Sequence, residues 1–290
     1  MKKIIKKTSD SAVVGMVSAI LIIGLIVAVI SIIQVIYVPV IMEQREAEHM
    51  DKVTEQFGSL TSIIDSQASN RIKGVPIATF VTLGNKELPF LVSSKAFGTL
   101  EILNNSCTVT ISHTPINSTT ETSIFPIGTI TYSSTNAYFL NQNYTYEAGA
   151  MIVSQSQGNL MMCLPGFFVN FNSITNTGTI SFDVVNISSV GKKTIAGGIG
   201  TYPIQTEFYD ISINTTYTNV DYITITTPHS NAWSDFINRS LKEADLKYNT
   251  QFILTNTGQA LKVKFLPSIT VEAIFKIIDI RAQIGPGWAE

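Results

Sequence analysis

The side chains best suited to chemistry are few and dispersed along the chain. The 290-residue sequence contains three histidines, His49, His113 and His229, and two cysteines, Cys107 and Cys163. Metal sites place such ligands at short fixed spacings, as in His-x-x-x-His or Cys-x-x-Cys, and many Ser–His–acid hydrolases carry a Gly-x-Ser-x-Gly turn. None of these patterns occurs in the sequence. It therefore predicts no metal, no cofactor and no catalytic residues.

Four carboxylates, Asp183, Glu207, Asp210 and Asp221, are the remaining candidates for acid–base chemistry. Glycosidases use a pair of carboxylates that leaves no local sequence signature. These four are widely spaced, as expected for solvated residues near strand ends. The sequence favours a protein that is not an enzyme, and an anchored extracellular hydrolase is kept as an alternative.

Composition limits the partners of the chain. Charged residues make up 14% of it, hydrophobic residues 45%, and the formal net charge is -2. Binding to nucleic acid requires clustered Lys and Arg to neutralise phosphates, so nucleic acid is excluded as a partner. The large apolar content provides enough surface to bury and excludes wholesale disorder.

An uncharged segment near the N-terminus predicts that the chain crosses a membrane, and the charges beside it predict on which side each part lies. The 32 residues from Ser11 to Met42 carry no charge, and four lysines precede them within the first seven residues. About 20 apolar residues cross a bilayer, and lysines favour the cytoplasmic side. A cleavable secretory peptide is the alternative, but its apolar core would be about 7–15 residues long. We expect residues 1–10 in the cytoplasm and residues 11–40 to form a transmembrane helix.

Small residues within this segment predict contacts between helices. Gly15 and Ala19 are four residues apart, as are Gly24 and Ala28. Such small-xxx-small spacing lets two helix backbones approach closely. The uncharged segment is also longer than a bilayer requires. Both features favour packing against other helices over a simple anchor.

The helix is expected to continue outside the membrane as a stalk over residues 41–70. Val53, Phe57, Leu60 and Ile64 recur at spacings of three and four, which places them on one helix face. This stripe is expected to pack against the following domain; the alternative is a stalk that contacts nothing. Pro39 is expected to kink the helix near Gln34 to Val38.

Residues 71–290 are expected to form an extracellular, mainly antiparallel β domain of sandwich type, giving an α+β chain. One short helix is predicted, with Ser230 as its capping residue, and the glycine-rich segment from Gly191 to Gly200 is interpreted as a loop. The candidate strands are Ile77–Leu83, Cys107–His113, Gly128–Ser133, Ala150–Ser154, Leu160–Leu164, Thr179–Val185, Ile211–Thr215, Tyr222–Thr227, Leu261–Phe265 and Thr270–Ile280.

Modification sites follow from the extracellular location. Cys107 and Cys163 are expected to form a disulfide, and two buried thiols are the alternative. Six Asn-x-Ser/Thr tripeptides are candidates for N-glycosylation. They begin at Asn104, Asn117, Asn143, Asn186, Asn214 and Asn238.

The organisation resembles that of archaeal type IV pilin-like surface proteins. The resemblance is carried by Ser9–Gly15 before the apolar helix, Arg45–Glu48 after it, Gly128–Tyr132, Tyr146–Ala150 and Ala232–Trp233. It implies a signal cut on the cytoplasmic side of the apolar helix. It also implies filaments whose core is made of packed helices, with the β domains displayed outside.

The sequence therefore predicts a single-pass cell-surface structural protein, a pilin-like subunit. Its expected partners are the membrane, identical or related pilin-like subunits and N-glycans. The alternative is a monomeric, membrane-anchored surface protein that binds a partner or mediates adhesion.

Overall fold

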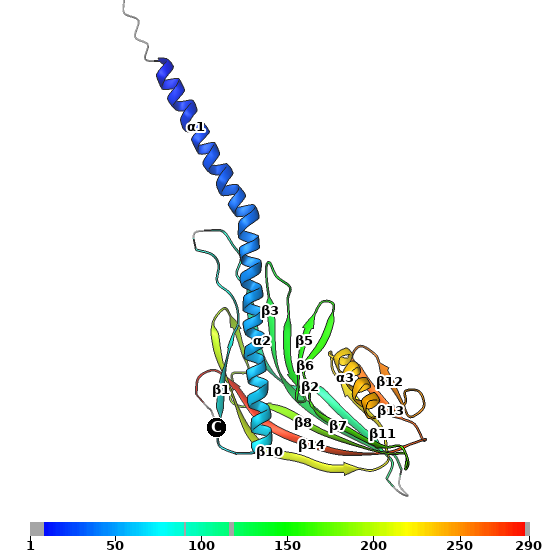
Figure 1. Ribbon diagram of the computed structural model, residues 1–290. Coiled ribbons are helices and arrows are strands. Elements are labelled where there is room, and N and C mark those ends of the chain that lie inside the picture. The colour runs from blue at the N-terminus through cyan, green and yellow to red at the C-terminus, as the bar shows by residue number, and fades with distance from the viewer. Residues whose placement is uncertain (1–8, 90, 116–118, 288–290) are drawn as a thin grey trace, which may run out of the picture.

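A long N-terminal helix leads into a domain built from two β-sheets and one short helix (Figure 1). The structure is a computed structural model that describes residues 9–89, 91–115 and 119–287. Most of the expected basic segment 1–10 therefore lies outside the described residues, and the first helix begins at Ser9. The expected α+β class, with a mainly antiparallel β domain, is confirmed.

The N-terminal helix consists of α1 (Ser9–Ile32), a π-helical turn η1 (Ile33–Tyr37) and α2 (Val38–Asn70). The Val38 N–H bonds to the carbonyl of Ile33, five residues earlier. Because Pro39 has no N–H to donate, the regular ladder is interrupted here. Figure 1 shows α1 and α2 meeting at an angle, so the kink expected near Gln34 to Val38 is confirmed.

One sheet has five strands. In spatial order they are β1 (Ile77–Thr82), β10 (Thr201–Tyr217), β14 (Thr270–Ile284), β8 (Thr177–Ser189) and β7 (Gly166–Asn172). Neighbouring strands are antiparallel except β14 and β8, which run parallel over their length from Thr270↔Thr177 to Ala282↔Ser189. A parallel pair joins segments far apart in the sequence, which local patterns do not reveal.

The other sheet has nine strands, all antiparallel. In spatial order they are β12 (Phe252–Asn256), β13 (Ala260–Phe265), β11 (Val220–Thr226), β2 (Phe97–His113), β3 (Glu121–Thr135), β4 (Asn143–Glu147), β5 (Ala150–Gln155) and β6 (Gly158–Cys163). The ninth, β9 (Ile195–Gly198), pairs with the beginning of β2. The segment from Gly191 to Gly200 is thus not a loop throughout, because four of its residues complete a ladder.

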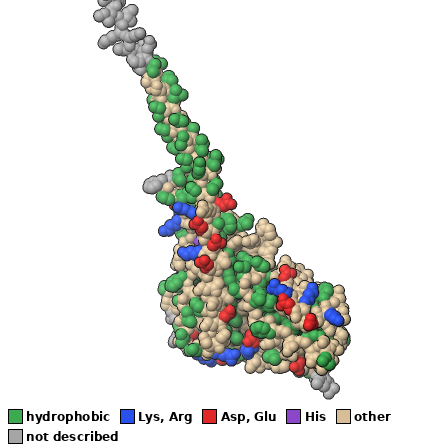
Figure 2. All heavy atoms as spheres, in the orientation of Figure 1, with side chains coloured by type: hydrophobic (Ala, Val, Ile, Leu, Met, Phe, Trp, Pro, Cys, Tyr) green, Lys and Arg blue, Asp and Glu red, His purple; other side chains and the backbone are tan. Residues whose placement is uncertain are grey.

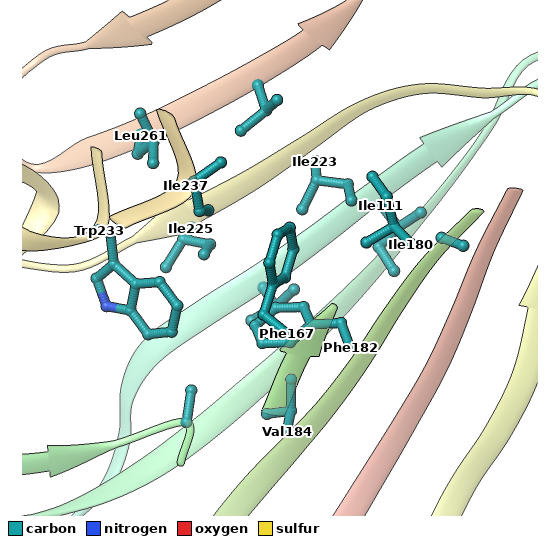
Figure 3. Packing of buried hydrophobic residues seen from close by; sticks show 14 of the residues in the cluster. Ile111, Phe167, Ile180, Phe182, Val184, Ile223, Ile225, Trp233, Ile237 and Leu261 are labelled. Carbon is teal, nitrogen blue, oxygen red and sulfur yellow. The ribbon is translucent and has the colours of Figure 1, made fainter. Parts of the chain in front are cut away.

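Two apolar clusters form the core between the sheets. In the first, helix α3 (Ser230–Glu243) packs its Trp233 beside Phe182, with ring centroids 6.1 Å apart, and Figure 3 shows these rings among aliphatic side chains from both sheets. In the second, α2 lies against β1, β10 and β14 of one sheet and against β4 and β5 of the other. Helix α3 begins at Ser230 with His229 in the capping position and no side-chain cap, so the expected capping role of Ser230 is wrong.

The two sheets approach each other closely at Gly128 on β3. A Cβ at this position would lie 1.9 Å from the backbone carbonyl oxygen of Ile187 on β8. The Gly128 N–H also donates to Oδ1 of Asn186, at 2.9 Å. Only glycine fits this contact without moving one sheet away from the other.

We expect Gly128→Ala to lower the free energy of unfolding by several kcal/mol, because the added methyl group overlaps a backbone atom. Gly58→Ala is the matched control. Gly58 lies within α2 with no atom near the position of a new Cβ, so alanine should raise stability there by up to about 1 kcal/mol. Denaturant unfolding of the full chain in detergent micelles measures both. A destabilisation of similar size in the two variants would contradict the close approach of the sheets.

Candidate functional site: the helix seat

The apolar part of the N-terminal helix has no partner within the described residues. Helix α1 and its continuation are long and apolar enough to cross a membrane, and none of the most apolar stretch is buried. Gly15 and Gly24 have no atom within 4 Å of the position of an added Cβ. Gly24 lies nine positions after Gly15, and at about 100° per residue the two small pairs face opposite sides of the helix. This arrangement suits contacts with two different neighbouring helices.

The continuation of the helix is part of the domain core. Val53, Phe57, Leu60 and Ile64 are each fully buried in the second cluster. The Phe57 ring lies 5.8 Å from that of Tyr144 and 6.3 Å from that of Tyr132, measured between centroids. The expected packing of the stripe against the domain is confirmed. We call this contact between α2 and the two sheets the helix seat.

A buried histidine, His49, lies at the end of the helix seat nearer to α1 and contacts Tyr132. His49 lies in a charged stretch of α2, yet it is only 7% exposed. Its Nε2 lies 3.2 Å from the Tyr132 hydroxyl, which donates to the Leu83 carbonyl at 2.9 Å. Since Tyr132 has only one proton to donate, Nε2–H of His49 is the donor to Tyr132. Burial lowers the pKa of His49. A hydrogen bond between His49 and the backbone of Leu83 acts in the opposite direction and raises the pKa.

A buried carboxylate ties α2 to a loop of the domain. Glu46 is fully buried, and its two oxygens accept backbone N–H groups from Ala137, Tyr138 and Phe139 at 3.1, 2.7 and 2.7 Å. Three donors aimed at one carboxylate replace the water that it loses on burial. Glu46 therefore holds the connection between β3 and β4 against the helix.

A second buried carboxylate, Glu147, joins the β4–β5 turn to α3. Its oxygens accept hydrogen bonds from Trp233 Nε1 at 2.7 Å and from the Thr227 hydroxyl at 2.8 Å, and the His229 ring nitrogen lies 3.2 Å away. Sequence reasoning did not single out this cluster. The available signal was that Tyr146–Ala150 and Ala232–Trp233 both belonged to the resemblance, and the structure brings them into contact.

The expected disulfide between Cys107 and Cys163 is wrong, because both thiols are free. Cys107 lies on β2 and Cys163 on β6, and β3, β4 and β5 separate these strands. At about 4.8 Å between neighbouring strands the two residues are far beyond the Cα separation of about 4.4–6.8 Å that a disulfide allows. Cys107 is buried in the first cluster, and burial raises the pKa of its thiol.

The candidate glycosylation sites differ in exposure. Asn104, Asn143 and Asn214 are exposed, whereas Asn238 is half-buried on α3; Asn117 lies outside the described residues. Glycosylation at these positions stays a prediction.

Asn186 stands apart from the other candidates because it links the two sheets. Its Nδ2 donates to Asp279 at 2.8 Å, and its Oδ1 accepts the N–H of Gly128. This side chain has a structural role that is independent of any glycan.

The four dispersed carboxylates each have a local structural partner. Asp183 pairs with Lys276 at 2.9 Å and Asp210 with Lys73 at 3.0 Å. Glu207 accepts the N–H of Gly74 at 2.6 Å, and Asp221 accepts the hydroxyl of Thr114 at 2.8 Å. Within the described ranges, no three His, Cys, Asp or Glu side chains gather in a way that would hold a metal ion.

The fold and the helix seat together define a β-sheet protein on a long N-terminal helix that is apolar enough at its free end to cross a membrane. The chain belongs to the family of unknown function DUF7289, whose pattern matches residues 10–252. The match runs from α1 to the first residue of β12. It therefore includes α2 and the Glu147 cluster, whereas β14, which also contacts α2 in the helix seat, lies outside it. No curated protein and no solved structure matches the chain.

The helix seat predicts a large stability effect at Phe57. We expect Phe57→Ala to lower the free energy of unfolding by about 3–5 kcal/mol, because it leaves a cavity beside the rings of Tyr132 and Tyr144. Phe168→Ala is the matched control, since Phe168 on β7 is 69% exposed and its loss should change stability by no more than about 0.5 kcal/mol. Denaturant unfolding in detergent micelles compares the two. Similar values for both variants would show that the stripe is not buried.

The buried histidine predicts a pH dependence. The pKa of His49 is lower in the folded chain than its ordinary value of 6.5, so the unfolded chain binds more protons in the interval between the two values. The stability that depends on neutral His49 is then complete above pH 6.5 and falls as the pH drops below it, with a slope of at most about 1.4 kcal/mol per pH unit. His49→Gln should remove this slope. Thermal unfolding between pH 5 and 8 tests it, and identical slopes for both proteins would contradict it.

Proposed function

We propose that the chain is a pilin-like structural protein of the cell surface. Its α1 helix anchors in the membrane or packs in the core of a filament, and the β domain is displayed outside the cell. One observation carries the proposal: an apolar helix without a partner in the described chain continues into a helix that forms part of the domain core.

The position of the small residues on α1 supports assembly over simple anchoring. A lipid-facing anchor has no need of small residues, because Leu and Ile suit lipid equally on every side. In α1 the two small pairs lie on opposite faces, and a subunit inside a helical array has neighbours on both sides. The helix seat supports the same proposal, since a rigid junction fixes the direction of the domain relative to such an array.

The proposed orientation places the N-terminus in the cytoplasm. Lysines precede the apolar run, and the segment that follows α1 carries more acidic than basic residues. Asn104, Asn143 and Asn214 are exposed on the side that would then be extracellular, where N-glycans are added.

Shearing of surface fibres from cells that express the full chain tests the assembly. We expect the chain in the sheared fibre fraction, and we expect Gly15→Leu and Gly24→Leu to remove it from the fibres while leaving it in the membrane. The bulky side chain would hold neighbouring helices apart. Ile23→Leu, which conserves volume on the same helix, is the control and should leave the fibres unchanged.

Recovery of the wild-type chain in the membrane fraction alone, as a monomer, would contradict assembly and favour the membrane-anchored surface protein. Recovery in the cytosol would contradict the anchor as well.

A further inference from the structure

The connection between β1 and β2 forms an extended loop beside the upper end of α2. We call residues 85–89 and 91–95 the interface loop. Its base is closed by a bridge between Asn85 and Ala96, whose N–H and carbonyl lie 3.1 Å apart. Nearer the tip, the Leu88 N–H donates to the Ser93 hydroxyl at 2.9 Å. Figure 1 shows this loop rising beside the helix at the level where α1 and α2 meet.

One side of the interface loop is anchored on the helix. Leu88 is buried together with Val38 and Met42, and Leu91 packs against them. The side-chain amide of Gln34 donates a hydrogen bond to the backbone carbonyl of Val92. Both contacts fix the height of the loop tip along the helix at the level of Gln34.

That height coincides with the edge of a bilayer crossed by α1. The helix from Ser11 to Gln34 is about 35 Å long at about 1.5 Å per residue. The hydrocarbon core is about 30 Å thick, and the headgroup regions bring the total to about 40–45 Å. A helix that enters the core near Ser11 therefore leaves it close to residue 31, and Gln34 lies in the outer headgroup region.

The side chains exposed at this height suit a lipid interface. Val92 at the loop tip is 81% exposed, and on the helix Val35 and Tyr37 are 72% and 58% exposed. Tyrosine is enriched where the hydrocarbon meets water. Glu87 and Lys95, which pair at 3.5 Å, lie nearer the base of the loop. Figure 2 shows the charged side chains gathered on the domain side of this level and an apolar helix on the other.

We propose that the interface loop is a second membrane contact, whose tip at Val92 lies in the outer headgroup region of the bilayer that α1 crosses. The proposal rests on the membrane anchoring in the proposed function. The occupant of this surface is lipid, because the tip continues the apolar surface of the spanning helix and the charges stay below it. Two contacts with the membrane, one through α1 and one through the loop, limit the tilt of the domain.

Fluorescence quenching by lipids tests the contact in the full-length protein. Single cysteines are placed at Val92, at Ile23 within α1 and at Ile174 in the β7–β8 turn, in a Cys163→Ser background, and labelled with an environment-sensitive dye. Ile23 and Ile174 are 60% and 92% exposed, so these substitutions leave the core intact, and thermal unfolding checks each variant. The Cys163→Ser parent measures any labelling of the buried Cys107.

The labelled proteins are inserted into phosphatidylcholine–phosphatidylglycerol vesicles that carry nitroxide groups either near the headgroup or deep in the acyl chain. For the dye at Val92 we expect an emission that is blue-shifted relative to the dye at Ile174. We also expect the shallow nitroxide to quench it more strongly than the deep nitroxide does. We expect the deep nitroxide to be the stronger quencher at Ile23, and neither nitroxide to quench Ile174.

The outcomes separate the two proposals. Quenching at Ile23 with Val92 behaving like Ile174 would overturn the loop contact and leave the anchor intact. Absence of quenching at Ile23 and Val92 alike would overturn the anchor and the loop contact together.

Discussion

Burial of the α2 stripe between two sheets determines where the rest of the molecule lies. Both sheets contribute apolar faces to the helix seat, so neither face would be covered without the helix. Because α1, η1 and α2 follow each other without a break, the direction of α2 in the core sets the direction in which α1 leaves the domain. A helix attached at its end alone would leave that direction free. The helix is therefore a structural part of the domain as well as its connection to the membrane, and a force applied to α1 reaches both sheets through the same buried side chains.

Local pattern was sufficient to predict the helix and most of the strands. The apolar residues around Phe57 recur at spacings of three and four. This pattern identifies a buried helix face without information about the surface against which it packs. Among the strands missing from the expected set, β4 begins in an Asn-rich stretch and β9 is half glycine. The other two, β7 and β12, contain aromatic and aliphatic residues typical of strands and were not assigned. The parallel pairing of β8 with β14 depends on the path of the chain between them, which no short window contains. The prediction of a disulfide was wrong because it, too, depends on the path of the chain. The number of cysteines and the compartment carry no information about which strands are neighbours.

Polar residues were harder to place than apolar ones. Glu46 and His49 lie in a charged stretch of the helix, and their residue types predict exposure to water. Their burial depends on partners distant in the sequence, namely the backbone N–H groups from Ala137 to Phe139 and the hydroxyl of Tyr132. The Glu46 carboxylate accepts three backbone N–H groups, and such donors allow a charged group to tolerate burial. Such partners are set by the tertiary fold. The segments that carry the resemblance contain Glu46 and Tyr132 but not His49, and they gave no indication of these contacts.

The bend at η1 is fixed by its surroundings. A π turn and a proline weaken the backbone ladder at a point where a helix would otherwise be straight and stiff. Here the weakened turn is flanked by the contact of Gln34 with Val92 and by the packing of Val38 against Leu88. Both partners belong to the loop between β1 and β2, and this loop is joined to the sheets at its two ends. The angle between the exposed and the buried parts of the helix is thus determined by the β domain. A change of angle would have to break these contacts, so the direction of α1 is a property of the folded domain as a whole.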